Sequence, residues 1–146
     1  MFKKLLVIFL FGIIFLGIAF VSINNKISYT NMKISSPAFE NNGSLSVKYT
    51  CDGEGLNPPL EFSGVPAEAK SLKLVVDDPD APSGTYTHWV VENIDPFTKK
   101  IEEGKNGYIP ACPPSGTHRY FFKLYALDAN GKEIAHAELV GLYKRK

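Results

Sequence analysis

Residues 77–89 read DDPDAPSGTYTHW, and residues 110–120 read PACPPSGTHRY. Each stretch joins a proline-rich turn to a histidine at the start of an expected strand, His88 in the first and His118 in the second. Proline fixes φ and removes a backbone donor, so both turns are predicted to be rigid loops that can hold side chains around a hollow. The rest of the chain is interpreted as the sheet framework that carries these two loops.

The strand before the first loop is expected over residues 71–78. Leu72, Leu74 and Val76 alternate with less apolar residues, as in a strand with one buried face. Asp78 falls at the end of that inward face, where a carboxylate needs a partner. It could accept a hydrogen bond from one histidine ring nitrogen, which would fix the tautomer and leave the other nitrogen for a ligand.

The next strand is expected over residues 86–94. Strict alternation would place His88, Val90 and Ile94 on one face and Trp89 on the other. Trp89 is therefore expected to be buried on a sheet face.

Other short strands are expected at residues 45–49, 60–62, 118–127 and 137–143. The strand at 118–127 is apolar on both faces, which is typical of a central strand, so Phe121 is also expected to be buried. Ten prolines, twelve glycines and many aromatic and β-branched residues favour a turn-rich protein. The sequence thus predicts an all-β, mainly antiparallel sandwich with few or no helices.

The N-terminal residues 1–23 predict a membrane or export segment. Lys3 and Lys4 precede an apolar run from Leu5 to Val21, about the length that crosses a bilayer core. We favour an uncleaved transmembrane anchor over a cleaved signal peptide, because small residues near Ala19 form only a weak cleavage site. The lysines before the run place the following domain outside the cytoplasm, anchored to the membrane or, after cleavage, secreted or periplasmic.

The length and net charge of the chain limit the number of domains and the classes of partner. After the leader and a polar linker over residues 24–31, residues 32–146 leave room for one domain. Lysine and arginine number 16 against 15 acidic residues, so the net charge of +1 gives no broad basic surface. Nucleic acid is therefore not expected as a partner.

Whole segments of the chain resemble the phosphatidylethanolamine-binding proteins, in particular the bacterial branch called Raf kinase inhibitor-like or YbhB/YbcL. The similar segments are DPDAP at 78–82, HWVV at 88–91 and CPPSGTHRYFFKLYALD at 112–128. The likeness begins with MKISSPAF at 32–39 and ends with AELVGLYKR at 137–145, so it covers the chain after the leader. The resemblance implies a Greek-key β-sandwich with a small anion-binding pocket.

The resemblance also implies a set of ligand-binding residues. The positions that match the family's pocket motifs are Asp78, Asp80, Pro82, His88, Pro113, Pro114, Gly116, His118 and Tyr120. Tyr143 matches a C-terminal aromatic residue at the pocket rim. From the residues alone, the two histidines could also be ordinary strand-end residues and Asp80 a turn residue. The segments after Ile101 and after Asp128 are shorter than in the family, and residues 129–132 are expected to form a tight turn in place of a helix.

The expected function is non-enzymatic binding of a phosphorylated or anionic small ligand of the phospholipid head-group type, without a cofactor. One alternative is a regulatory module that inhibits a kinase or protease. Another is a hydrolase with Ser115 or Cys112 as nucleophile, although no GxSxG motif is present. Cys51 and Cys112 could form a disulfide or remain two free thiols. A zinc site is not expected, because close CxxC or HxxxH pairs are lacking.

Overall fold

A computed structural model describes residues 31–105 and 107–145. The leader predicted at residues 1–23 and all but the last residue of the predicted linker lie outside these ranges. Within them, no helix has both the length and the apolar character that a membrane span requires.

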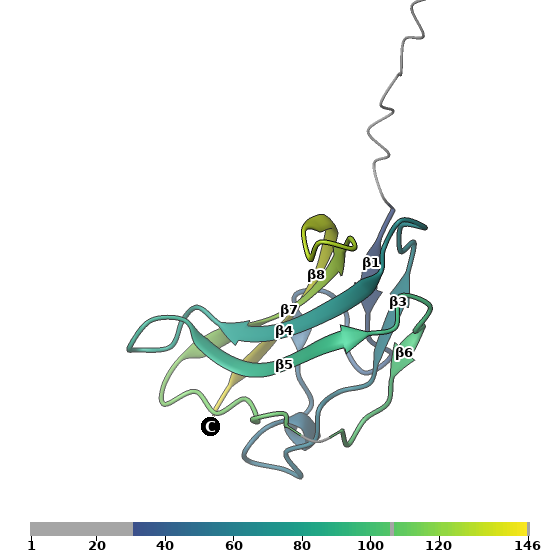
Figure 1. Cartoon of the computed structure of the whole chain (residues 1–146). Coiled ribbons are helices and arrows are strands. Elements are labelled where there is room, and N and C mark those ends of the chain that lie inside the picture. Colours follow the sequence, from purple (N-terminus) through teal and green to yellow (C-terminus); the bar gives the residue numbers. More distant parts are fainter. Residues whose placement is uncertain (1–30, 106, 146) are drawn as a thin grey trace, which may run out of the picture.

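The described residues form two β-sheets (Figure 1). The smaller sheet has the strand order β1 (Lys33–Ser35), β3 (Leu60–Ser63), β6 (Lys100–Ile101). The larger sheet has the strand order β2 (Gly43–Ser44), β8 (Glu133–Lys144), β7 (Thr117–Leu127), β4 (Ser71–Asp78), β5 (Tyr86–Ile94). All these pairings are antiparallel except that of β2 with β8, which confirms the mainly antiparallel all-β prediction. The larger sheet sets the hairpins β4–β5 and β7–β8 side by side, with β4 next to β7.

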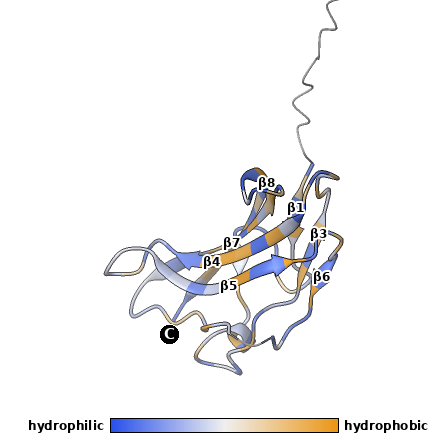
Figure 2. Ribbon diagram, viewed as in Figure 1, coloured by the Kyte–Doolittle hydropathy of each residue, from blue (hydrophilic) through white to orange (hydrophobic). Residues whose placement is uncertain are grey.

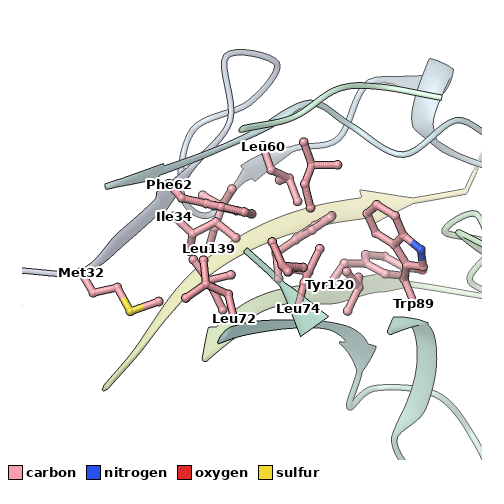
Figure 3. Packing of buried hydrophobic residues seen from close by; sticks show 14 of the residues in the cluster. Met32, Ile34, Leu60, Phe62, Leu72, Leu74, Trp89, Tyr120 and Leu139 are labelled. Atoms are coloured by element: carbon pink, nitrogen blue, oxygen red, sulfur yellow. The ribbon is translucent and has the colours of Figure 1, made fainter. Parts of the chain in front are cut away.

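The core lies between the two sheets. The large apolar side chains on the inner face of β4 and β7 are at most 1% exposed; they are Leu72, Leu74, Val76, Tyr120, Phe122 and Leu124. Ile34, Leu60 and Phe62 belong to the same buried cluster and come from the smaller sheet. Apolar and polar positions alternate along the strands (Figure 2), as expected when each strand buries one face. Figure 3 shows Tyr120 and Trp89 together at one end of the packed cluster and Met32 at the other.

A β-bulge in β5 brings both His88 and Trp89 inward. Val76 pairs with Trp89, whereas the next residue of β4, Asp77, pairs with Thr87, so His88 is an extra residue on its strand. A bulge of this kind interrupts the alternation of side chains. His88 and Trp89 are accordingly 6% and 4% exposed. The expected burial of Trp89 is confirmed, but its placement on the face opposite His88 was wrong.

A second irregularity in β5 corrects the predicted position of Val90. Leu72 pairs with Ile94, whereas Leu74 pairs with Val91, so the β5 side again contains one residue more than β4. Val90 is 47% exposed while Ile94 is buried. The prediction that these two residues share a face was therefore wrong.

Residues 45–49 do not form the expected strand. They contain a short 3-10 helix, η1 (Val47–Tyr49), and β2 ends just before them. The Ser46 side chain accepts a hydrogen bond from the backbone N–H of Lys48 at 3.4 Å. Such a local bond competes with strand pairing, and Val47 is left 48% exposed. Only the two ends of the segment, Leu45 and Tyr49, are buried, so its apolar alternation does not mark one buried strand face.

Phe121 is only half-buried, so its predicted burial was wrong. It lies on the outer face of the larger sheet, where the cations of Arg119 and Lys123 are 5.6 and 5.4 Å from the ring centroid. These distances are typical of cation–π contacts, which leave an aromatic residue partly open to solvent.

The tight turn expected at residues 129–132 is confirmed. The backbone N–H of Asp128 donates to the carbonyl of Lys132 at 2.9 Å, and that of Gly131 donates to the carbonyl of Asp128 at 3.0 Å. The turn joins β7 directly to β8, so no helix lies between the last two strands.

Candidate ligand pocket

A cavity of about 260 Å³ lies on the inner side of the larger sheet, near the strand end at Asp78. It is lined by Asp78, Ala81, Pro82, Tyr86, His88, Ile109, Pro110, Cys112, Pro114, His118 and Tyr120. These residues come from β4, β5, β7 and the two proline-rich loops. The loops that the sequence singled out therefore meet around one hollow.

Asp78 and His118 form a buried pair in this cavity. His118 Nδ1 donates to Asp78 Oδ2 at 2.6 Å, and the two side chains are only 8% and 5% exposed. Asp78 Oδ1 accepts from the backbone N–H of Asp80 at 2.8 Å. Because the carboxylate holds the proton on Nδ1, the other ring nitrogen of His118 is left for a ligand. This is the arrangement expected for an aspartate at the end of an inward strand face.

His88 is anchored to the second proline-rich loop. Its Nδ1 lies 2.8 Å from the carbonyl oxygen of Ile109, and the backbone N–H of Ile109 donates to the carbonyl of His88 at 2.9 Å. Since a carbonyl oxygen only accepts, Nδ1 of His88 carries the proton. Burial lowers the pKa of this imidazole below its ordinary value of 6.5.

Tyr120 supplies a buried hydroxyl without a matched partner. The residue is 1% exposed, and its hydroxyl makes no hydrogen bond with the other described residues. The backbone N–H of Cys112 lies close enough to influence the hydroxyl oxygen, but the two groups do not form a well-aligned hydrogen bond. Burial raises the pKa of the phenol, so it remains a neutral donor. An unpaired buried hydroxyl costs stability, and such groups often serve a ligand.

Asp80 does not line the cavity. Its carboxylate binds Arg119 through Nε at 2.9 Å and Nη2 at 2.7 Å, and it also accepts from the Arg119 backbone N–H at 2.9 Å. The guanidinium hydrogen bonds lower the pKa of Asp80 to about 2. Asp80 thus ties the first loop to β7, and the ion pair expected for Arg119 is present.

The other residues implied by the resemblance divide into two groups. Pro82 and Pro114 line the cavity, whereas Pro113 and Gly116 do not. Pro113 is a fully buried residue of the second loop. Gly116 has a φ of +72°, a conformation that favours glycine and lets the chain turn into β7. Pro113 and Gly116 therefore fix the conformation of the loop and do not form part of the cavity surface.

Tyr143 is not at the pocket rim, which corrects the sequence expectation. Its hydroxyl donates to Asp52 Oδ2 at 2.7 Å, and the residue lines a separate surface hollow with Val47 and Lys144.

A disulfide joins Cys51 to Cys112. Next to it, the backbone N–H of Cys51 donates to the carbonyl of Ala111 at 3.0 Å, and Thr50 forms an isolated bridge with Ala111. The loop that contributes Ile109 to the cavity is thereby fastened to the segment after η1. No cluster of histidine, cysteine and acidic side chains suited to a metal ion occurs among residues 31–105 and 107–145.

Several residues that line the cavity were not predicted from the sequence. Tyr86 contacts His88 edge-on at 4.9 Å between ring centroids, and His88 contacts Tyr120 edge-on at 5.2 Å. Tyr86 had a visible signal, because it opens the same strand as His88. Ile109 and Pro110 had none, because their position depends on the path of a loop fastened by the disulfide.

The fold and the cavity together define a small β-sandwich with a histidine-lined pocket at one end. The family model described as phosphatidylethanolamine-binding protein matches residues 35–144. The chain therefore belongs to the phosphatidylethanolamine-binding protein family, as the resemblance indicated.

Relatives and solved structures agree with this assignment. A UPF0098 protein of Methanothermobacter thermautotrophicus is 42% identical, with 78% of this chain and 99% of the relative aligned. A Chlamydia trachomatis structure described as a putative phosphatidylethanolamine-binding protein homolog has a TM-score of 0.76 at 38% identity, covering 80% of this chain and 99% of its own. Escherichia coli YbcL, described as a member of the mammalian family, has a TM-score of 0.70 at 26% identity, covering 79% and 99%.

Proposed function

We propose that the pocket binds a small phosphorylated or otherwise anionic ligand without converting it. The observation that carries the proposal is the anchoring of both histidines through Nδ1, His118 by Asp78 and His88 by the Ile109 carbonyl. In each ring Nε2 has no hydrogen-bond partner among the described residues. Each Nε2 can accept from a P–OH group when its ring is neutral or donate to a phosphoryl oxygen when its ring is protonated, and the Tyr120 hydroxyl can donate in either case.

The apolar walls of the cavity favour a ligand with an organic substituent. Pro82, Tyr86, Ile109 and Pro110 supply apolar surface around the polar groups. Ligand sites commonly combine such walls with a few fixed polar groups. A small phosphorylated compound of the phospholipid head-group type, such as phosphorylethanolamine, fits this description, and the name of the family supports it.

The arrangement favours binding over hydrolysis. Of the two nucleophiles considered in the sequence, Cys112 is in a disulfide and has no thiol, and Ser115 is exposed and does not line the cavity. A nucleophile must lie within hydrogen-bond reach of its base. Neither residue therefore forms a nucleophile–histidine pair in this pocket.

The first test is calorimetric titration with phosphate and with phosphorylethanolamine. We expect wild type to bind, and His88→Ala to bind at least about tenfold more weakly, because a hydrogen bond to a charged ligand contributes about 1.5–3 kcal/mol. His136→Ala is the matched control, since His136 is exposed and paired with Glu133 at 2.7 Å. Equal affinity in wild type and His88→Ala would remove His88 from the site.

We also propose that the domain lies outside the cytoplasm, held by the segment expected at residues 1–23. The lysines before the apolar run support this orientation. The disulfide supports it as well, because disulfides persist mainly in oxidising compartments.

Protease added to spheroplasts is expected to digest the domain, while untreated membranes retain the full-length chain. A cytoplasmic protein that stays intact serves as the control. Recovery of a soluble mature form that starts after Ala19 would contradict the anchor.

A further inference from the structure

We propose that the pocket selects phosphomonoesters in their protonated, singly charged form over phosphodiesters and sulfate esters, because His88 presents a hydrogen-bond acceptor to the ligand. The inference rests on the proposed function and specifies its ligand class. A phosphomonoester monoanion carries one P–OH group, whereas a phosphodiester and a sulfate ester carry the same charge without that proton.

The acceptor follows from the geometry of His88. Its Nδ1 must donate to the Ile109 carbonyl, so in the neutral ring Nε2 has only a lone pair. The ring is held in place by the reciprocal backbone bond from Ile109 and by edge-on contacts with Tyr86 and Tyr120. Turning the ring would break the bond to the carbonyl and disturb both aromatic contacts.

The surroundings keep His88 neutral near pH 7. From β4, the carboxylates of Asp78 and Asp77 favour its protonated form, while His118 on β7 opposes it. The hydrogen bond to the Ile109 carbonyl also favours protonation, but burial outweighs it and the carboxylates and lowers the pKa of His88 below 6.5. The other titratable neighbours, Tyr86 and Tyr120, contact the ring as aromatic groups.

The charges around the cavity favour a singly charged ligand. Asp78 lies beside His118, so this pair carries no net positive charge even when the imidazole is protonated. The nearby Arg119 is bound to Asp80 and does not line the cavity. A doubly charged ligand would thus find no net positive charge on the residues that line the cavity, unless His88 were protonated.

These features assign contacts to two of the ligand's oxygens. The ligand's P–OH donates to Nε2 of His88, and a phosphoryl oxygen accepts from the Tyr120 hydroxyl. The latter contact would satisfy the buried hydroxyl that has no partner among the described residues. Without a P–OH group, an oxygen lone pair of the ligand would face the lone pair of His88, an arrangement that disfavours binding.

The test is titration of the full domain with methyl phosphate, dimethyl phosphate and methyl sulfate from pH 5 to 8. At pH 6 methyl phosphate is expected to bind at least about tenfold more tightly than the other two, the effect of one hydrogen bond. As pH falls, protonation turns His88 into a donor, so the other two probes gain affinity and the ratio shrinks. Above the second pKa of a phosphomonoester, about 6, methyl phosphate loses its proton and its affinity falls.

Two variants separate the roles of the pocket groups. His88→Phe keeps an aromatic ring but removes the acceptor, so the three probes are expected to bind within about threefold of one another. Tyr120→Phe removes a donor that serves all three probes, so each binds more weakly while the ratio is kept. Thermal unfolding checks that both variants fold, and the wild-type ratio across pH does not depend on either variant.

The outcomes distinguish this inference from the proposed function. If all three probes bind wild type equally at pH 6, or if the ratio does not change with pH, the selection is wrong while anion binding stands. If none of the probes binds, both proposals fail.

Discussion

Replacing Asp78 with alanine is expected to lower the free energy of unfolding by about 3–5 kcal/mol, the usual cost of removing one partner from a buried ion pair. The carboxylate is buried and accepts from His118 Nδ1 and from the backbone N–H of Asp80. Alanine would leave both donors without their buried acceptor. Urea denaturation of the variant and of wild type at pH 7 gives the difference directly.

Asp78→Asn is the matched control, because asparagine keeps the size and shape of the side chain but removes its charge. Its side-chain oxygen can still accept from the backbone N–H of Asp80, so we expect a smaller loss of stability than with alanine. The amide cannot stabilise a protonated His118, so anion binding is expected to weaken even where the fold is kept. Equal stability of Asp78→Ala and wild type would show that the buried pair does not contribute to the fold.

Removing the disulfide is expected to have the next largest effect. It closes 61 residues of sequence, for which loop-closure entropy gives about 4 kcal/mol of stabilisation. A variant with both cysteines changed to serine is therefore expected to unfold at a markedly lower urea concentration. The same variant should bind phosphate more weakly, because the fastened loop carries the carbonyl that orients His88.

Reduction of the wild-type protein provides the control for the serine substitutions. Wild type in dithiothreitol is expected to match the double variant, and oxidised wild type to exceed both in stability. The account of the disulfide would be wrong if reduced and oxidised wild type unfolded at the same urea concentration.

The strands that carry the pocket could be predicted because their patterns are regular. Leu72, Leu74 and Val76 alternate without interruption, and Asp78 continues their face into the cavity as expected. The hairpin between β7 and β8 followed from the short polar turn after Asp128. Where one face of a strand is buried, its apolar period fixes its orientation.

The irregular features could not be predicted, because a bulge leaves no mark in an apolar pattern. The extra residue at His88 places this ring beside Trp89 on the inner side, although strict alternation separates the two. At residues 45–49 the apolar alternation resembled a strand, but the segment forms a short 3-10 helix with Ser46 as its N-cap. In both places a local backbone arrangement overrides the period of two.

For the site, sequence similarity located the loops better than it assigned individual roles. Asp78, His88, His118 and Tyr120 meet at one cavity, whereas Asp80 turns to Arg119. Asp80 lies between prolines, and its direction depends on a cation that only the folded chain brings near. The long-range contact with Ile109 likewise depends on the folded loop and has no local pattern.

The most direct test of the central claim is ring-nitrogen NMR of the three histidines during titration with phosphate. The account predicts that Nε2 of His88 and of His118 shift together and saturate at the same phosphate concentration, while the ring of exposed His136 does not saturate with them. A titration in which His136 alone responds, or in which neither pocket histidine shifts, would contradict binding at this site.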